Sequence, residues 1–122
     1  MKDTSQFNAT ILVINHEPDE RESISMVLEL DGYRVLSAET GAEGLQQAQQ
    51  HPDLILCKFS LPGGYAGDAM RALLQADPET ASIPVIWTMI TSQHRDPTGQ
   101  IYLKLPFDAD DLLKLVGNCL NR

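Results

Sequence analysis

Cysteine, aromatic and basic residues are all scarce in this chain, which has two cysteines and 6% aromatic residues. Neither Cys57 nor Cys119 has further metal-ligating residues at the spacing that a structural metal site requires. We expect both to be reduced thiols, as is usual for cytoplasmic proteins. A chain of 122 residues buries enough apolar surface to fold without a disulfide or metal. No cofactor or metal is therefore expected.

Nine Lys and Arg residues against seventeen Asp and Glu residues give a net charge of −8. Nucleic acids and anionic membrane surfaces both bind clusters of basic residues, and the sequence contains no such cluster. It also lacks the run of about 18 apolar residues that a membrane-spanning helix needs. We therefore expect neither nucleic acid nor membrane as a partner. The polar residues 1–9 are expected to be a disordered lead-in.

Apolar strands alternate with amphipathic helices along the rest of the chain. Continuous apolar runs are typical of strands buried on both faces, and we expect strands at 10–15, 33–38, 53–58, 83–89 and 100–104. Helical spacing and capping residues predict helices at 18–31, after Thr40, at 65–76 and after Asp108. Gly32 is expected to end the first of these helices and Thr40 to cap the second, while Met70, Leu73 and Leu74 are expected to point inward from the third. This alternation predicts an α/β fold with a doubly wound, five-stranded parallel sheet of order 2-1-3-4-5, which is the flavodoxin-like arrangement.

The connection between the fourth and fifth predicted strands is too short for the strand–helix alternation seen elsewhere in the chain. Residues 90–99 must hold two loops of about two to six residues each and a helix whose mean length is about eleven. They also include Pro97 and Gly99. The fourth helix is therefore predicted to be short or missing.

Several runs in the sequence resemble the receiver (CheY-like) domains of two-component response regulators. They are ILVINHEPDERES, DGYRVLSAETGAEGL, HPDLILCKFSLPG, IPVI and YLKLPF, in this order. The similarity extends over residues 11–120, so we expect residues 10–122 to form one receiver-like domain. The resemblance implies a signalling module that accepts a phosphoryl group from a histidine kinase on an aspartate beside a bound Mg²⁺ ion.

The same resemblance implies that the phosphorylation pocket is degenerate. Its acid pair corresponds to Asn15 and His16, its acceptor aspartate to Lys58, its Thr or Ser to Met89 and its Lys to Leu105. Glu17, which follows the acid pair, keeps its charge.

The replacements all act against phosphorylation. Lys58 has no carboxylate and its positive charge opposes Mg²⁺, while Met89 and Leu105 cannot hold a phosphoryl group. Asp53 is the nearest acid on that strand, but it lies at the opposite end of the sheet. We expect no catalytic residue and no enzymatic activity.

Two of these residues allow two interpretations each. Lys58 is either a built-in cation that pairs with Glu17 or a strand-end lysine that extends into solvent. His16 is either a metal ligand or pH switch, or an ordinary surface residue.

The leading hypothesis is a pseudo-receiver that acts through protein–protein interaction without aspartyl phosphorylation. Its partner would be a histidine kinase, another regulator or a signalling complex, and a homodimer is left open. The expected interaction face comprises Trp87, Ile101, Tyr102 and Leu103, with Trp87 included only if the missing helix exposes it. The alternatives are a phosphorelay receiver with an unorthodox acceptor, and a small-molecule-sensing domain with a pocket near Trp87 and Tyr102.

Overall fold

The computed structural model describes residues 9–89, 101–104 and 106–120. Its centre is a five-stranded sheet in the order β2-β1-β3-β4-β5, and every neighbouring pair of strands is parallel. The strands are β1 (Thr10–Ile14), β2 (Arg34–Ala38), β3 (Leu54–Lys58), β4 (Val85–Met89) and β5 (Ile101–Lys104). The predicted fold class and strand order are both confirmed.

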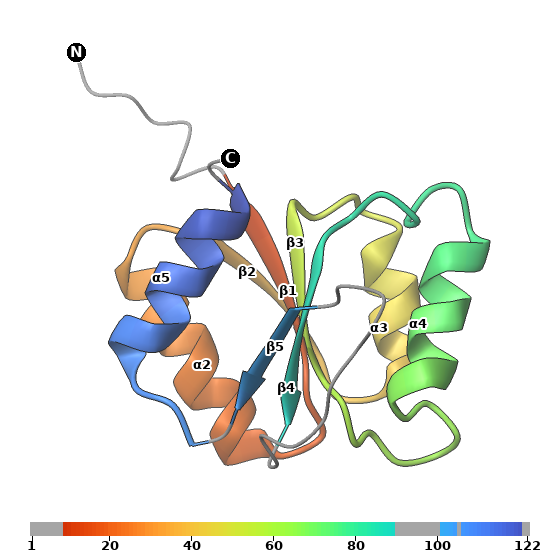
Figure 1. Ribbon diagram of the computed structural model, residues 1–122, viewed down its shortest axis with the longest axis horizontal. Helices are drawn as coiled ribbons and strands as arrows, with labels where there is room; N and C mark the ends of the chain where they lie inside the picture. Colours follow the sequence, from red (N-terminus) through yellow and green to blue (C-terminus); the bar gives the residue numbers. More distant parts are fainter. Residues whose placement is uncertain (1–8, 90–100, 105, 121–122) are drawn as a thin grey trace.

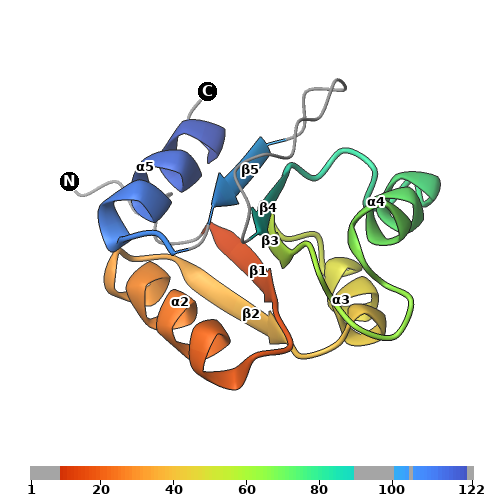
Figure 2. The same ribbon diagram turned by 60° about the horizontal axis from the view of Figure 1, so that its bottom comes forward.

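Two helices cover each face of the sheet, as Figures 1 and 2 show. The helices are α2 (Pro18–Leu30), α3 (Gly41–Ala48), α4 (Gly67–Ala76) and α5 (Ala109–Leu120). Helices α2 and α5 pack on one face, and α3 and α4 pack on the other. None of the described helices is long and apolar enough to cross a membrane.

Successive side chains of each strand point to opposite faces, so the apolar strands supply two separate core layers. The layer under α2 and α5 contains Val13, Leu56 and Ile86. The layer under α3 and α4 contains Ile14, Cys57 and Trp87. Every residue of β3 is buried, which explains why that strand has no polar alternation in the sequence.

Local sequence signals fix several helix ends. Pro18 stands at the first turn of α2, and Gly32, just after that helix, has a φ of 98°, which favours glycine. The Thr40 side chain accepts a hydrogen bond from the Glu43 backbone N–H at 3.0 Å and caps α3. The predicted roles of Thr40 and Gly32 are confirmed.

Two details differ from the prediction. Helix α4 begins at Gly67 and not at residue 65, because Ala66 is extended with a ψ of 141°. Leu73 was expected to point inward with Met70 and Leu74, but it is 44% exposed. Met70 and Leu74 lie four residues apart on one helical face, whereas Leu73 lies at the edge of that face.

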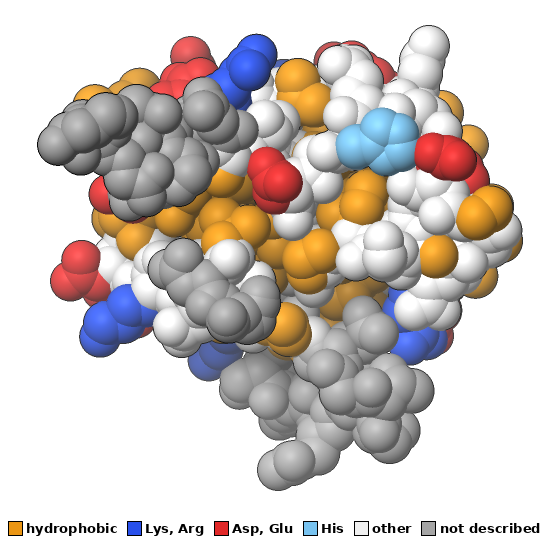
Figure 3. Space-filling view, turned by 90° about the horizontal axis from the view of Figure 1, so that it is seen from above, with side chains coloured by type: hydrophobic (Ala, Val, Ile, Leu, Met, Phe, Trp, Pro, Cys, Tyr) orange, Lys and Arg blue, Asp and Glu red, His pale blue; other side chains and the backbone are white. Residues whose placement is uncertain are grey.

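Three predictions fall outside the described residues. They are the disordered lead-in at the N-terminus, the short or missing fourth helix within residues 90–99, and the placement of Leu105. Figure 3 shows the end of the sheet where the strands begin. Among the described residues on this face, apolar side chains gather near the middle and charged side chains lie scattered around them.

Candidate functional site

The candidate site lies where the strands end, at the lower edge of the molecule in Figure 1. Asn15 follows β1 directly, Lys58 is the last residue of β3 and Met89 is the last residue of β4. The register aligns Ile14 with Cys57 and Lys58 with Thr88. Parallel strands thus bring Asn15, Lys58 and Met89 to one edge, as the sequence pattern predicts.

Lys58 is held in a partly buried ion pair at this edge. The residue is 7% exposed, and its Nζ donates a hydrogen bond to Oε1 of Glu20 at 3.0 Å. The Asn15 amide donates to the same Glu20 oxygen at 2.8 Å. One carboxylate oxygen on α2 therefore ties together the ends of β1 and β3.

Both predicted environments of Lys58 need correction. The lysine does not extend into solvent, and its partner is Glu20, not Glu17. Glu17 precedes the first turn of α2 and its side chain is 55% exposed, with His16 as its neighbour at 3.6 Å. Glu20 lies three residues further on, within α2, where its side chain reaches the end of β3.

Asn15 also fixes the turn between β1 and α2. Its side-chain Oδ1 accepts a hydrogen bond from the Glu17 backbone N–H at 2.9 Å. Arg21 donates from Nη1 to the Asn15 backbone oxygen at 2.8 Å. With its amide nitrogen bound to Glu20, the 1%-exposed Asn15 uses both ends of its side chain.

The Glu20 carboxylate is held in its ionised form. Burial opposes ionisation, but hydrogen bonds from Asn15 and Lys58 and the charge of Lys58 outweigh it. The pKa of Glu20 therefore lies below its ordinary value. The carboxylate accordingly stays charged, and stays paired with Lys58, at neutral pH.

His16 is half-buried beside this pair. Its Nε2 lies 3.6 Å from Oε2 of Glu17, and its buried Nδ1 has no hydrogen-bond partner within the described part of the chain. Within the described residues, no three His, Cys, Asp or Glu side chains are grouped so that they could hold a metal ion.

Asp53 lies at the opposite end of the sheet, as predicted. It directly precedes β3, and its Oδ2 accepts a hydrogen bond from the backbone N–H of Thr10 at the start of β1, at 2.7 Å. The full length of β3 therefore separates this carboxylate from Lys58.

The end of β4 contributes two buried side chains. Met89 is 7% exposed, and Thr88, next to Lys58 in the register, is 1% exposed. Among the residues that the structure describes, the Thr88 hydroxyl has no hydrogen-bond partner.

The expected interaction face is only partly accessible. Ile101, Tyr102 and Leu103 are half-buried on the edge strand β5. Trp87 is 1% exposed, so its inclusion in that face is wrong for this conformation. Its ring lies edge-on to Phe59 with centroids 6.0 Å apart, and Phe59 lies at the same distance from Tyr102.

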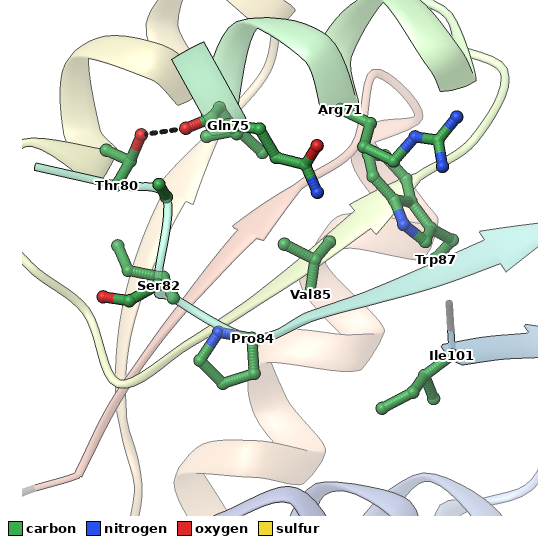
Figure 4. Close-up of a pocket in the computed structure, with 11 residues that line it drawn as sticks. Arg71, Gln75, Thr80, Ser82, Pro84, Val85, Trp87 and Ile101 are labelled. Atoms are coloured by element: carbon green, nitrogen blue, oxygen red, sulfur yellow. Dashed lines mark hydrogen bonds between the residues drawn. The ribbon is translucent and has the colours of Figure 1, made fainter. Parts of the chain in front are cut away.

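A small cavity lies beside Trp87, as Figure 4 shows. Its volume is about 270 Å³, and its lining includes Arg71, Gln75, Val85, Trp87 and Ile101 but not Tyr102. The hydroxyl of Thr80 at its rim already donates to the Leu74 carbonyl at 2.6 Å. The cavity is smaller than most ligand pockets, which hold about 300–1,000 Å³.

A larger cavity borders the Lys58–Glu20 pair. Its volume is about 510 Å³, and it lies between α2 and the residues that lead into α5. The lining residues are Asp19, Glu20, Ser23, Ile24, Lys58, Pro106 and Phe107.

Sequence analysis missed Glu20, the residue that organises this site. The signal was available, because Glu20 follows Glu17 by three residues and so lies one turn into the predicted helix. The resemblance to receiver domains assigns site residues only at and just after the ends of strands, and Glu20 lies within a helix. A lone basic residue at the end of an apolar strand should prompt a search for acids in the next helix.

The chain matches the response regulator receiver domain family over residues 11–116 and belongs to that family. Among curated proteins it is 34% identical to protein PilH of Pseudomonas aeruginosa, covering 92% of this chain and 98% of PilH. It is also 34% identical to the DNA-binding dual master transcriptional regulator RpaA of Synechocystis, covering 92% of this chain and 49% of RpaA. The chain thus spans nearly all of PilH but about half the length of the transcriptional regulators it matches.

Solved structures agree with the fold. A putative response regulator from Chloroflexus aurantiacus matches with a TM-score of 0.80 and 27% identity, covering 93% of this chain and 98% of that chain. The chemotaxis response regulator CheY4 of Vibrio cholerae matches with a TM-score of 0.84 and 23% identity, covering 92% and 98%. The CheY4 likeness concerns the fold alone.

Proposed function

We propose that this receiver domain is a signalling module that works through protein–protein interaction without aspartyl phosphorylation. The buried Lys58 ammonium at the end of β3, 3.0 Å from Glu20, is the observation that carries the proposal. This is the position that the resemblance assigns to the acceptor aspartate. An ammonium group can neither accept a phosphoryl group as an acyl phosphate nor bind a cation.

The surrounding residues do not fit a Mg²⁺ ion. Mg²⁺ requires several oxygen ligands at about 2.0–2.1 Å in near-octahedral geometry. Here the Asn15 side-chain oxygen is bound to a backbone N–H, and the Glu20 oxygen is shared between Asn15 and Lys58. The positive charge of Lys58 would repel a dication brought to the same place. We therefore derive no phosphoryl-transfer step for this chain.

In this proposal the Lys58–Glu20 ion pair stands in for the metal. It links α2 to the sheet in one arrangement, so the surface offered to a partner does not depend on phosphorylation. A histidine kinase, another regulator or a larger signalling complex are the classes of partner that this function implies. Ile101, Tyr102 and Leu103, half-buried on an edge strand, remain the proposed contact surface together with α5.

The experiment is a phosphodonor test read by intact-protein mass. The protein is incubated with acetyl phosphate and Mg²⁺, and we expect no mass increase corresponding to a phosphoryl group. The matched control carries Asn15→Asp, His16→Asp, Lys58→Asp, Met89→Thr and Leu105→Lys, which rebuild the pocket, and should be labelled. A second phosphorylatable receiver domain verifies the phosphodonor in the same run.

Labelling of the unmodified protein would overturn the proposal and favour a phosphorelay receiver with an unorthodox acceptor. Peptide mapping would then identify the acceptor, with Glu20, whose Oε1 lies 3.0 Å from Lys58 Nζ, as the first candidate. Labelling that persists in Lys58→Ala and disappears in Glu20→Gln would assign that role to Glu20.

A further inference from the structure

The cavity of about 510 Å³ beside Lys58 has the size of a small-molecule site, since ligand pockets hold about 300–1,000 Å³. Ile24, Pro106 and Phe107 give it apolar walls. Lys58 and Glu20 contribute a polar end, and Ser23 adds a hydroxyl. The cavity is open to solvent on one side, and apolar walls with a few polar groups are the usual composition of a site for an organic ligand.

The Lys58 ammonium has unused donors at the polar end. A lysine ammonium carries three N–H donors. Within the described part of the chain, this one donates a single hydrogen bond, to Glu20. Lys58 is 7% exposed and lines the cavity. Because these donors face a cavity that is open to solvent, an oxygen acceptor of a ligand could take the place of water beside Lys58.

Charge decides the class of acceptor. Lys58 and Glu20 neutralise each other, and Asp19 adds a further negative charge to the lining. A carboxylate or phosphate would therefore be repelled by two acids while it competed with Glu20 for Lys58. A protonated amine could pair with the two acids, but it has no lone pair and so cannot accept a hydrogen bond from Lys58. A neutral carbonyl, as in an amide, ketone or ester, satisfies the free donors without either conflict.

We propose that this cavity binds a small neutral organic molecule that has an apolar body and a carbonyl group directed at Lys58. The apolar body would lie against Ile24, Pro106 and Phe107. The ligand would join α2 to the segment before α5, so its binding would change the outer surface of both. This inference does not rest on the proposed function, because a domain that is phosphorylated elsewhere could carry the same cavity.

The test compares three compounds that share a phenyl body and differ in the polar end: phenylacetamide, phenylacetate and phenethylamine. Each is titrated into ¹⁵N-labelled protein, and amide chemical shifts are followed. We expect saturable shifts from phenylacetamide at Ser23, Ile24, Lys58 and Phe107. The anion and the cation should bind about tenfold more weakly or not at all, because the two acids repel the anion and the cation cannot accept a hydrogen bond from Lys58.

Two variants and a control complete the test. Lys58→Met largely keeps the length of the side chain but removes its N–H donors, and should weaken the binding of phenylacetamide about tenfold. Phe107→Ala removes an apolar wall and leaves the Lys58–Glu20 ion pair in place. It should also weaken the binding of phenylacetamide. Glu29→Ala, on the same helix but away from the cavity lining, should leave the affinity unchanged.

Several results would overturn the proposal. They are the absence of saturable shifts at the lining residues, tighter binding of phenylacetate than of phenylacetamide, or equal affinity of the Lys58→Met protein. If Lys58→Met does not fold, the order of the three compounds on the unmodified protein still decides. A negative result here would leave the phosphodonor test untouched, so the two proposals fail separately.

Discussion

At the scale of single residues, the Lys58–Glu20 pair is asymmetric. The side chain of Lys58 is 8% exposed, whereas that of Glu20 is 35% exposed. Removal of Glu20 leaves a buried ammonium without its acceptor, while removal of Lys58 leaves a carboxylate that water can reach. The cost of breaking an ion pair falls on the charge that remains buried.

We therefore predict that Glu20→Ala lowers the free energy of unfolding by about 1–3 kcal/mol. Lys58→Met should cost less, because methionine replaces the buried aliphatic stem and leaves a solvated acid. Urea denaturation of both variants measures the difference. Glu22→Ala is the matched control, since Glu22 is an exposed acid of the same helix, and should change stability by no more than about 0.5 kcal/mol.

A larger loss in Lys58→Met than in Glu20→Ala would contradict this account. It would mean that the stem of Lys58, and not its charge, dominates its contribution to the core.

The lowered pKa of Glu20 makes part of the stability depend on pH. A carboxyl group whose pKa is lower in the folded state stabilises the fold above its unfolded pKa, about 4.5, and loses this contribution as pH falls through the folded value. We expect the difference in unfolding free energy between the unmodified protein and Glu20→Gln to be constant near neutral pH and to shrink below that value. Urea titrations at a series of pH values measure it, and a difference that grows on acidification would refute the assignment.

At the scale of secondary-structure elements, α4 begins under a steric constraint. Gly67 has a φ of +36°, and a Cβ there would lie 2.3 Å from Cζ of Phe59. The Gly67 backbone N–H also bonds to the Phe59 carbonyl at 2.6 Å. The start of α4 is thus fixed against the aromatic side chain that follows Lys58.

Gly67→Ala should therefore destabilise the domain by about 3 kcal/mol, through both the clash and the backbone conformation. Gly64→Ala is the control: its φ is +84°, but a Cβ there meets nothing within 4 Å. It should cost only about 1 kcal/mol. Thermal or urea unfolding compares the two. Equal losses of unfolding free energy in the two variants would show that Phe59 moves aside and that its ring does not restrict the side chain at position 67.

Sequence patterns predicted the elements well and their contacts less well. Continuous apolar runs identified the three inner strands β1, β3 and β4, because strands buried on both faces need apolar side chains throughout. The edge strands β2 and β5 were also predicted, although they are only partly buried. The partner of Lys58 was predicted wrongly because pairing depends on how far α2 rotates over the sheet, and periodicity does not specify that rotation. Leu73 was misplaced for a related reason, since the edge of a helical stripe is buried only if a neighbour covers it.

At the scale of the whole molecule, the sheet separates two core layers that share no side chains. Lys58 and Glu20 belong to the side of α2 and α5, whereas Cys57, one residue earlier, belongs to the side of α3 and α4. A ligand or partner beside Lys58 therefore acts directly on one layer. Any effect on the other layer must cross the sheet, whose central strand β3 is buried at all five residues.

The two cysteines differ in exposure, so their reaction rates with a thiol reagent distinguish the folded protein from its opened form. Cys57 is 0% exposed and burial raises the pKa of its thiol, so the reactive thiolate is suppressed in the folded protein. Cys119, on α5, is partly exposed. We predict that a chromogenic disulfide reagent modifies Cys119 rapidly and Cys57 only when the fold opens.

The Cys119→Ser variant isolates the slow reaction of Cys57. If Gly67→Ala costs about 3 kcal/mol of stability, adding it to Cys119→Ser should make the modification of Cys57 about 100-fold faster. Rapid modification of Cys57 in the stable fold would mean that the layer under α3 and α4 opens locally, without global unfolding.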